Sequence, residues 1–536
     1  MARSERVDVM VAMNVQTYAE DMASVRPGGW LIYDSTWPRS QLLDREDIDV
    51  VGVPLSRMCN EHFDTVRARI LMKNIAYVGV VAALLDIDVE VIHSLLGETF
   101  ASKSHLVESN LEAIRIGYDY ACKNFQCPLP VRVEKMDKTA DHIIIDGNTA
   151  AGLGCVYAGA TVGAWYPITP STSLMDAYKM FCKQYRVDEE GKKRFCIVQA
   201  EDELAAIGVV LGAAWNGARA FTPTSGPGIS LMNEFIGFAY YAEVPAVIFD
   251  VQRTGPSTGM PTRTQQCDLL FCAYASHGDT RHVLLFPSNP AECFYMAPAA
   301  FDLADRLQTP VMVLSDIDIG MNDWMCPDLK WDNEYKPDKG KVLSAEDLQG
   351  MEKFYRYLDV DGDGIPYRTL PGEDPKGAYF TRGSGHSKYG TYTENPDDYQ
   401  EVVDRLLIKW DTARGLVPEP EIQYSKFNQN AILSLGSCDG AVKEAIVKLK
   451  EKNIGLNYCR VRAFPFSDAI RDFIDKHDRI YVVEQNRDAQ LRTLLMLDID
   501  AAPEKLLPML HYNGLPVSAD FIMDRVLDES AKGQAA

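Results

Sequence analysis

The sequence predicts an α/β protein built from several doubly wound domains. Strand-like apolar runs alternate with helical segments along most of the 536 residues, as expected of parallel sheets with helical connections. Several of these runs are apolar throughout, which is typical of strands covered by helices on both faces. A chain of this length should hold roughly three to four domains.

Changes in composition divide the chain into four predicted parts. Residues 1–135 and 136–325 both alternate between strand-like and helical segments, and residues 421–536 return to this pattern. Between them, residues 326–420 are rich in Pro, Gly, Asp and Tyr, which predicts an irregular insertion or a long linker.

The individual elements follow from apolar periodicity and from the turn residues that bound it. In the first part we expect strands at 7–13, 30–34 and 49–53, a buried helix at 74–85 and an amphipathic helix at 106–123. In the second we expect strands at 143–145, 195–199, 220–224, 245–253 and 310–315, with helices after Gly147-Asn148 and over 203–214. In the last we expect strands at 431–436 and 479–484, with helices over 439–452 and from residue 489.

Composition and charge narrow the function classes. The chain is 46% hydrophobic and 24% charged, with a formal net charge of −22, which disfavours duplex nucleic acid or an anionic membrane as the main partner. Its longest uncharged apolar run, residues 75–85, is far shorter than the roughly 20 residues that span a bilayer. The N-terminus leads into a strand-like segment rather than a signal-peptide core. We therefore expect a cytoplasmic protein.

The twelve cysteines are scattered, and none forms a Cys-x-x-Cys pair. Structural zinc and iron–sulfur sites normally use close pairs or runs of cysteines. The pattern predicts reduced thiols, most of them in the core, and no metal site in this chain.

Two prolines enclose a threonine in the segment Tyr166-Pro167-Ile168-Thr169-Pro170. Proline fixes φ and lacks a backbone N–H, so this segment should be a rigid, non-helical turn. The Thr169 hydroxyl, held in such a turn, is a candidate for ligand binding. The alternative is a stiff loop that caps the next helix, with Ser171 or Thr172 as the N-cap.

Charged residues stand at the ends of two predicted strands. Glu201, Asp202 and Glu203 lie at a strand-to-helix junction, where they either complement the helix dipole or place one carboxylate in a pocket for proton transfer. Arg253 ends another strand, where open α/β sheets bind ligands. Its planar fork suits a substrate carboxylate, and a structural salt bridge is the alternative.

Two glycine patterns imitate cofactor motifs without completing them. Gly152-Leu153-Gly154 with Gly159 lacks the last glycine of a dinucleotide loop, so close helix packing is the favoured interpretation. The segment from Asp359 to Gly364, with Asn395 downstream, imitates both a magnesium–diphosphate site and the start of an EF-hand. Prolines follow it instead of a helix, and Leu370 occupies the position of the bidentate Glu, so a polar turn is favoured over a structural cation site.

Six segments stand in a fixed order between residues 147 and 269. They are Gly147-Asn-Thr-Ala150, Tyr166-Pro-Ile-Thr-Pro170, Glu201-Asp-Glu203, Thr224-Ser-Gly-Pro-Gly-Ile-Ser-Leu-Met232, Arg253-Thr-Gly-Pro-Ser-Thr-Gly259 and Gln265-Gln-Cys-Asp-Leu269. Together they resemble the alpha subunit of 2-oxoacid:ferredoxin oxidoreductases, with residues 136–325 as a thiamine-diphosphate pyrimidine-binding-like domain.

The resemblance extends less specifically to the rest of the chain. Asn74–Gly79 and Asn110–Ala113 resemble the family's gamma domain, here fused ahead of alpha. Gly383–His386 with Tyr392–Glu394 resembles its inserted segment, and Val483–Asn486 with Gln490-Leu491 resembles its transketolase-C-like domain. The usual opening Gly-Gly-Gln-Gly loop of the gamma domain does not occur, which implies an N-terminally shortened gamma domain. The fusion is most similar to the 2-oxoglutarate enzymes.

The resemblance implies a shared active site. Thiamine diphosphate would lie between this chain and a beta subunit, with Glu203 at the aminopyrimidine and Tyr166, Pro167 and Ile168 beside it. Thr169 and Arg253 would hold the 2-oxoacid, with Thr262 as a weaker candidate. Mg²⁺ and a [4Fe–4S] cluster would belong to the beta subunit, in a heterodimer or heterotetramer.

The implied reaction is the CoA-dependent oxidative decarboxylation of 2-oxoglutarate, with ferredoxin as electron acceptor. Two alternatives stay open. The substrate could be pyruvate or another 2-oxoacid, or the chain could be a non-catalytic supporting subunit.

Overall fold

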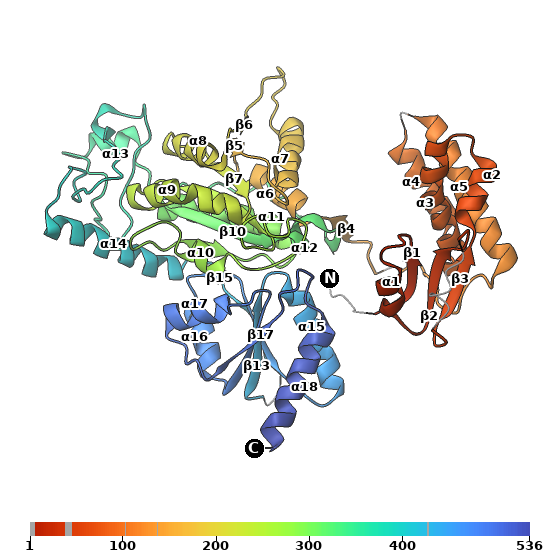
Figure 1. Cartoon of the computed structure of the whole chain (residues 1–536). Helices are drawn as coiled ribbons and strands as arrows, with labels where there is room; N and C mark the ends of the chain where they lie inside the picture. The colour runs from red at the N-terminus through yellow and green to blue at the C-terminus, as the bar shows by residue number, and fades with distance from the viewer. Residues whose placement is uncertain (1–5, 38–44, 102, 137, 426–427, 536) are drawn as a thin grey trace. The chain divides into compact units, whose positions relative to one another are not determined.

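The computed structural model describes residues 6–37, 45–101, 103–136, 138–425 and 428–535. The chain forms two compact units, Ser4–Ala140 and Asp141–Ala536, each drawn in Figure 1. The three parts expected after residue 135 all pack into the second unit.

The N-terminal unit combines a parallel three-stranded sheet, in the order β1-β2-β3, with long helices. Its elements are β1 (Val7–Ala12), α1 (Tyr18–Ser24), β2 (Val25–Asp34), β3 (Asp49–Val53), α2 (Leu55–His62), α3 (Val66–Leu85), α4 (Val89–Thr99) and α5 (Ser104–Asn124). The strand expected at 49–53 coincides with β3, whereas the expected helix at 74–85 begins eight residues earlier, at Val66.

Helices α3 and α5 cross at very short distance because glycines face each other's backbones. A Cβ at Gly79 would lie 1.9 Å from the Ile114 carbonyl oxygen, and a Cβ at Gly117 would lie 2.0 Å from the Ala76 carbonyl oxygen. Within the described ranges, α3 is the one helix whose length and hydropathy would suit a membrane span, and 44% of its most apolar window is buried in this unit. Length and composition alone do not distinguish a core helix from a membrane span.

The second unit begins with a large α/β domain. Its elements are β4 (His142–Ile145), α6 (Gly147–Tyr157), β5 (Val162–Trp165), α7 (Thr172–Tyr185), β6 (Cys196–Gln199), α8 (Glu203–Trp215), β7 (Ala220–Thr224), α9 (Gly226–Ala242), β8 (Ala246–Gln252), α10 (Leu269–Ala273), β9 (Val283–Leu285), α11 (Pro290–Leu307), β10 (Pro310–Asp316), α12 (Ile317–Met321) and β11 (Trp324–Pro327). The predicted strand at 220–224 coincides with β7, and β4 pairs with β11 outside the main sheet.

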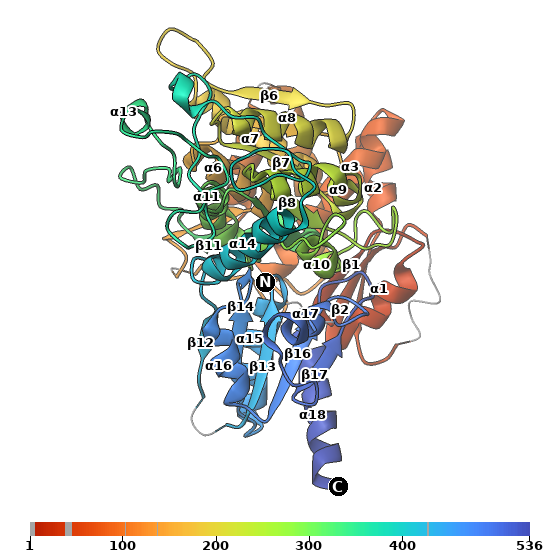
Figure 2. The ribbon, with the colours of Figure 1, turned by 90° about the vertical axis from the view of Figure 1, so that its left-hand side faces the viewer.

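The main sheet is doubly wound, as predicted. Its order is β15-β9-β10-β8-β7-β5-β6, and the six strands from β5 to β10 run parallel. Helices α6, α7 and α11 cover one face and α8 and α9 the other, as Figure 2 shows from the side. Strand β15 (Ala463–Phe464) joins antiparallel to β9 from far along the chain.

The glycines of α6 serve helix packing, as the sequence indicated. A Cβ at Gly152 would lie 2.8 Å from the backbone nitrogen of Tyr178 in α7, and one at Gly154 would lie 2.5 Å from the carbonyl oxygen of Phe294 in α11. The small residues therefore let α6 pack closely against both neighbouring helices.

The segment expected to be irregular is only partly so. It contains α13 (Ala345–Gln349), a 3₁₀ turn (Pro375–Gly377) and then the long helix α14 (Pro396–Arg414). The predicted irregular insertion or linker therefore ends in a long regular helix. Pro396 begins this helix, Asn395 caps it through the Asp397 N–H, and Val402, Leu406 and Trp410 recur on its buried face.

The Asp359–Gly364 segment is a polar turn. Asp359 accepts hydrogen bonds from the backbone N–H groups of Asp361, Gly362 and Gly364, while the Lys341 ammonium lies 2.7 Å from Asp361 and 2.8 Å from Asp363. The lysine thus offsets part of the negative charge of this turn. No metal-binding group of three or more His, Cys, Asp or Glu side chains occurs among the described residues.

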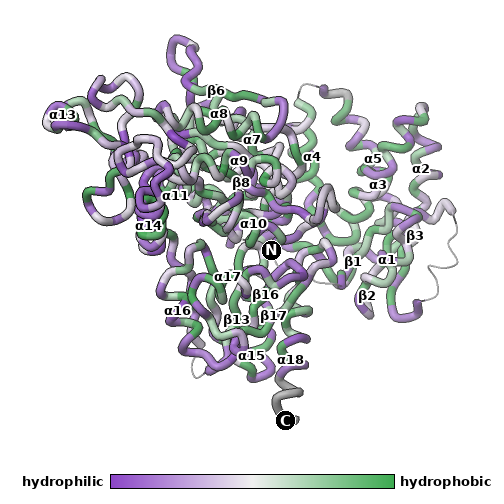
Figure 3. The backbone as a smooth tube through the Cα atoms, turned by 60° about the vertical axis from the view of Figure 1, so that its left-hand side comes forward, coloured by the Kyte–Doolittle hydropathy of each residue, from purple (hydrophilic) through white to green (hydrophobic). Residues whose placement is uncertain are grey.

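The C-terminal domain carries a five-stranded sheet in the order β12-β14-β13-β16-β17, parallel except for β12. Its elements are β12 (Glu421–Gln423), β13 (Asn430–Leu435), α15 (Cys438–Glu451), β14 (Asn457–Val461), β15, α16 (Asp468–Asp475), β16 (Arg479–Glu484), α17 (Gln490–Ile499), β17 (Leu506–Leu510) and α18 (Ala519–Ala535). Figure 3 shows the hydrophobic colour on its central strands, β13 and β16, and the strand expected at 479–484 coincides with β16.

Candidate active site

The candidate site lies at the carboxyl edge of the seven-stranded sheet, at the point where the connecting helices change from one face of the sheet to the other. After β5 the chain continues into α7 on one face, whereas after β7 it continues into α9 on the other. Such a switch point opens a crevice at the strand ends, which is where open α/β sheets bind ligands. Four predicted site segments follow strands β5, β6, β7 and β8 at this edge.

The turn after β5 is held by its neighbours rather than by a helix cap. Asn148, which is 1% exposed, donates from Nδ2 to the Pro170 carbonyl oxygen at 2.8 Å and to Ser173 Oγ at 2.9 Å. Ser171 occupies the N-cap position of α7, yet its hydroxyl donates back to the Ile168 carbonyl oxygen at 3.1 Å. The capping alternative is therefore not what orders this turn.

The turn presents an open surface in this chain. Tyr166, Pro167 and Thr169 are exposed, and Ile168 is half-buried. Within the described part of the chain, no hydrogen bond engages the Thr169 hydroxyl, which is therefore accessible to a ligand or to another chain.

Arg253, directly after β8, is the second predicted residue that the structure brings to the turn. Its Nη1 donates to the Thr169 carbonyl oxygen at 2.5 Å, and the side chain is 7% exposed. No carboxylate of the described residues lies within ion-pair distance of the guanidinium, and its buried Nε has no partner. Burial lowers the pKa of Arg253, and the charge of Asp268 opposes that shift. The salt-bridge alternative is therefore absent here, and the cation is free to receive an anion.

Glu203 is the buried carboxylate of its acidic cluster. It is 5% exposed at the first turn of α8, whereas Glu201 and Asp202 are exposed and Asp202 caps the helix through the Ala205 N–H at 2.6 Å. A Cβ at Gly228, near the start of α9, would lie 3.0 Å from Glu203 Cγ and 1.9 Å from Thr224 Oγ1. A glycine is thus required where Glu203 passes the N-terminus of α9.

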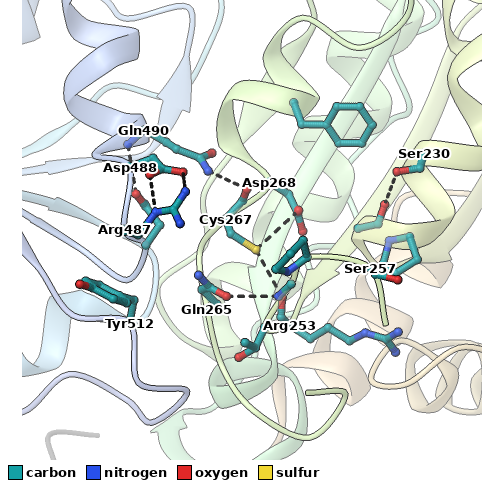
Figure 4. Close-up of a pocket in the computed structure, with 17 residues that line it drawn as sticks. Ser230, Arg253, Ser257, Gln265, Cys267, Asp268, Arg487, Asp488, Gln490 and Tyr512 are labelled. Carbon is teal, nitrogen blue, oxygen red and sulfur yellow. Dashed lines mark hydrogen bonds and ion pairs between the residues drawn. The ribbon is translucent and has the colours of Figure 1, made fainter. Parts of the chain in front are cut away.

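A cavity of about 590 Å³ adjoins Arg253. Figure 4 shows that it lies between the large α/β domain, which contributes Ser230, Gln265 and Asp268, and the C-terminal domain, which contributes Arg487 and Tyr512. Thr262 is exposed in a loop near this cavity but does not line it. The structure therefore unites Arg253 with Thr169, places Glu203 at the same sheet edge and leaves Thr262 apart.

Two of the recognised motifs meet in a hydrogen-bonded seam between these domains. Gln266 donates its backbone N–H to the Gln485 carbonyl oxygen at 2.8 Å and receives the Asn486 amide at its own carbonyl at 3.0 Å. Gln490 bonds both the Cys267 carbonyl and the Leu270 N–H. These residues fix the segment that follows Arg253.

Three residues at the site could not be identified from the sequence. Asn148 was quoted only as part of a motif, although its amide holds the turn that carries Thr169. Asp250 and Asp268 were not singled out, because one lies inside an apolar strand and the other in a short loop. A charged residue within an otherwise buried strand is the signal that could have marked Asp250.

Comparisons with known proteins agree with this architecture. Family models described as "Pyruvate flavodoxin/ferredoxin oxidoreductase, thiamine diP-bdg" and "Pyruvate ferredoxin/flavodoxin oxidoreductase" match residues 153–342 and 1–120. A 2-oxoacid:ferredoxin oxidoreductase subunit alpha of Sulfurisphaera tokodaii is 30% identical over 86% of this chain and 72% of that protein. The 2-oxoglutarate synthase subunit KorA of Methanothermobacter thermautotrophicus is 30% identical over 69% of this chain and 94% of that subunit.

A solved structure is similar over nearly the whole length. The 2-oxoglutarate:ferredoxin oxidoreductase from Magnetococcus marinus, with 2-oxoglutarate, coenzyme A and succinyl-CoA bound, has a TM-score of 0.86 and 27% sequence identity. The match covers 98% of this chain and 88% of that one.

Proposed function

Because this chain belongs to the 2-oxoacid:ferredoxin oxidoreductases as an alpha subunit, we propose that it forms the 2-oxoacid site of a 2-oxoglutarate-oxidising enzyme. The observation that carries the proposal is the buried Arg253 guanidinium, which bonds the Thr169 carbonyl and has no carboxylate partner among the described residues. A 2-oxoacid carboxylate would supply that partner. The KorA relatives and the Magnetococcus structure favour 2-oxoglutarate as the substrate.

The residues present fit the pyrimidine end of thiamine diphosphate. The domain matches a thiamine-diphosphate-binding family, and Glu203 is a buried carboxylate held against Gly228 at the sheet edge. When bound, this cofactor supplies the nucleophilic carbon and the electron sink for decarboxylation. Glu203 would hold a proton at the aminopyrimidine nitrogen, Arg253 would orient the oxoacid, and the Thr169 turn would shape the entrance.

The other half of the site is proposed to lie on a beta subunit. The described residues hold no cluster suited to a metal, and Tyr166, Pro167 and Thr169 lie open at the edge where a second chain would cover them. We therefore assign Mg²⁺, the diphosphate and a [4Fe–4S] cluster to that partner. Electrons would pass to ferredoxin and the acyl group to CoA, in the cytoplasm, within a heterodimer or heterotetramer.

Reconstitution with the beta subunit tests the proposal. The complex should reduce a viologen dye only when a 2-oxoacid and CoA are both present, and it should prefer 2-oxoglutarate to pyruvate. The alpha chain alone should be inactive. A preference for pyruvate or for an aromatic 2-oxoacid would overturn the substrate assignment, and turnover by the isolated chain would overturn the division of the site.

A matched pair of variants separates catalysis from scaffolding. Glu203→Gln should lower kcat by about 10²- to 10⁴-fold, the range typical of a lost acid–base group. Glu201→Gln, which changes an exposed carboxylate two residues away, should leave kcat unchanged. Full activity of Glu203→Gln would support a non-catalytic role for this subunit.

A further inference from the structure

Two carboxyl groups beside the cavity, the fully buried Asp250 and the half-buried Asp268, form no ion pair within the described residues. Asp250 lies in the middle of β8 and is 0% exposed, and Asp268 lines the cavity just before α10. In the described part of the chain their nearest hydrogen-bond donors are weak thiols: Cys272 Sγ lies 3.6 Å from Asp250 Oδ2, and Cys267 Sγ lies 3.7 Å from Asp268 Oδ1. Ionising both groups would be costly, because Asp250 is fully buried and the Oδ2 atom of Asp268 is also shielded from solvent.

The two carboxyl oxygens without a hydrogen-bond donor indicate where a proton would be bound. Asp250 Oδ1 and Asp268 Oδ2 are both buried, and neither receives a hydrogen bond when both groups are taken as carboxylates. Cys272 lies between the two residues: its backbone N–H donates to the Asp268 carbonyl oxygen at 2.8 Å, and its Sγ lies 3.6 Å from Asp250 Oδ2. The two side chains are thereby neighbours that can share a hydrogen bond once one of them is protonated. A single proton on Asp250 Oδ1, donated to Asp268 Oδ2, satisfies both atoms.

Two other deeply buried acids of this unit are paired with cations. Glu243 is paired with Arg405 and Lys409, and Asp305 is paired with Arg219 and Arg368. Among the residues that the structure describes, no cation forms an ion pair with Asp250 or Asp268, although an unpaired buried charge is costly in a protein interior. Sharing one proton halves the charge that the two groups would otherwise carry.

The pair lies against the predicted reaction site. A Cβ at Gly226, the first residue of α9, would lie 2.7 Å from Asp268 Oδ2, while Gly228, two residues on, adjoins Glu203. Arg253 follows Asp250 by three residues and feels the charge of Asp268. Figure 4 shows its side chain directed away from Asp268, consistent with its hydrogen bond to Thr169.

We propose that Asp250 and Asp268 are positioning residues that share one proton and so present a single negative charge beside Arg253. This proposal rests on the proposed function for the identity of the anion that Arg253 receives. With one proton held, the pair carries a charge of −1, which offsets the positive charge of Arg253 without forming an ion pair with it. Loss of that proton would add a second negative charge, which would attract Arg253 and repel the carboxylate of an incoming 2-oxoacid.

The surroundings favour the singly ionised pair. Burial raises the pKa of both carboxyl groups, most strongly that of Asp250, and the charge of Asp268 raises the pKa of Asp250 further. Burial also raises the pKa of the two thiols, which stay neutral. The neighbours of the pair are mostly uncharged: Thr224 on β7, Leu314 on β10, Gly226 on α9 and the thiols of Cys267 and Cys272. Arg253 is the neighbouring cation. The other charged groups are Glu203, beyond Gly228, and Arg487 and Asp488, at the far side of the cavity.

Two measurements on the reconstituted complex test the inference. For the unmodified enzyme, KM for 2-oxoglutarate should rise at least about threefold between neutral and alkaline pH as the shared proton is lost, while kcat stays level. Asp250→Asn keeps a donor to Asp268 and one negative charge, so its KM should lose this rise. Asp268→Asn, which leaves Asp250 protonated, should lose it as well. Asp176→Asn, an exposed change on α7, should keep it.

Infrared difference spectroscopy of the full alpha chain gives a readout independent of turnover. The carbonyl stretch of a protonated carboxyl should be present at neutral pH, disappear in Asp250→Asn and persist in Asp176→Asn. An unchanged spectrum in Asp250→Asn, or an absent band in the unmodified chain, would overturn the shared proton. An unaltered KM profile in both asparagine variants would overturn the positioning role. Because the infrared band does not depend on turnover, it should still be present if the proposed function is wrong and the complex does not oxidise 2-oxoglutarate.

Discussion

Arg253 Nη1 donates a hydrogen bond to the Thr169 carbonyl oxygen at 2.5 Å, across two loops that are 84 residues apart in the chain. The acceptor is the backbone of the turn rather than the threonine hydroxyl. The guanidinium therefore fixes the turn while its remaining N–H groups stay available, and the hydroxyl stays exposed. Asn148 holds the same turn from the other side through the Pro170 carbonyl.

This relationship predicts that Arg253→Lys is not conservative. Lysine keeps the charge but cannot bond the turn and a carboxylate through one planar fork. We expect kcat/KM for the 2-oxoacid to fall by roughly 30- to 1,000-fold, about 2–4 kcal/mol, while thiamine diphosphate binding measured by calorimetry is retained. Arg263→Lys, an exposed change in the following loop, is the control. Equal kinetics for the two variants would remove Arg253 from the site.

Gly228→Ala should damage the site without touching a functional group. The added Cβ would lie 1.9 Å from Thr224 Oγ1 and 3.0 Å from Glu203 Cγ, so that Glu203 must shift. A displacement of this size near reacting groups can reduce kcat by about 100-fold. Gly212→Ala is the matched control, because its Cβ in α8 would meet no atom within 4 Å. Steady-state kinetics and circular dichroism of both variants would separate displacement from unfolding, and normal turnover by Gly228→Ala would contradict the packing argument.

The sequence predicted the features of this site that depend on neighbouring residues, but not the contacts between residues that are far apart in the chain. The strand expected at 220–224 and the buried helix that begins at Glu203 rest on apolar runs and boundary residues, and the structure shows both. The pairing of Arg253 with the turn could not be read from the residues alone, because it joins a strand end to the backbone of a distant loop. Helix α14 was not predicted, although Asn395, Pro396 and the spacing of its apolar residues are typical of a helix. The Gly- and Pro-rich segment before it gave the whole of residues 326–420 the composition of a loop.

In the N-terminal unit, Gly79→Ala should destabilise the fold, although replacing a glycine inside a helix by alanine usually stabilises it. Alanine in a helix interior is favoured over glycine by roughly 1 kcal/mol, but here the Cβ would lie 1.9 Å from the Ile114 carbonyl oxygen. Helices α3 and α5 would have to separate, at a cost of about 1–3 kcal/mol or more. Gly97→Ala in α4 meets open space and should be neutral or slightly stabilising. Thermal unfolding of the two variants checks the prediction, and an equal melting temperature would contradict the close crossing.

The ion cluster around Glu243 should hold α14 on the large α/β domain. Glu243, at the end of α9, is fully buried and pairs with Arg405 and with Lys409 at 2.9 Å, both on α14. Glu243→Gln leaves two buried cations without their counterion, which should cost about 3–5 kcal/mol. Hydrogen exchange along Pro396–Arg414 should accelerate accordingly. Glu401 also lies on α14 and forms an exposed ion pair with Lys388, which precedes the helix. Glu401→Gln should change the stability by less than about 1 kcal/mol.

The pH dependence of this difference distinguishes charge pairing from a change in shape. Burial alone would raise the pKa of Glu243, but Arg405 and Lys409 outweigh it and hold the pKa far below its usual range. A carboxylate with a depressed pKa in the folded state contributes stability that is fully present above its unfolded pKa of about 4.3 and is lost as the pH falls below it. The protection gap between the unmodified chain and Glu243→Gln should therefore narrow as the pH falls below about 5. A gap that is independent of pH would mean that the glutamine disturbs packing rather than charge.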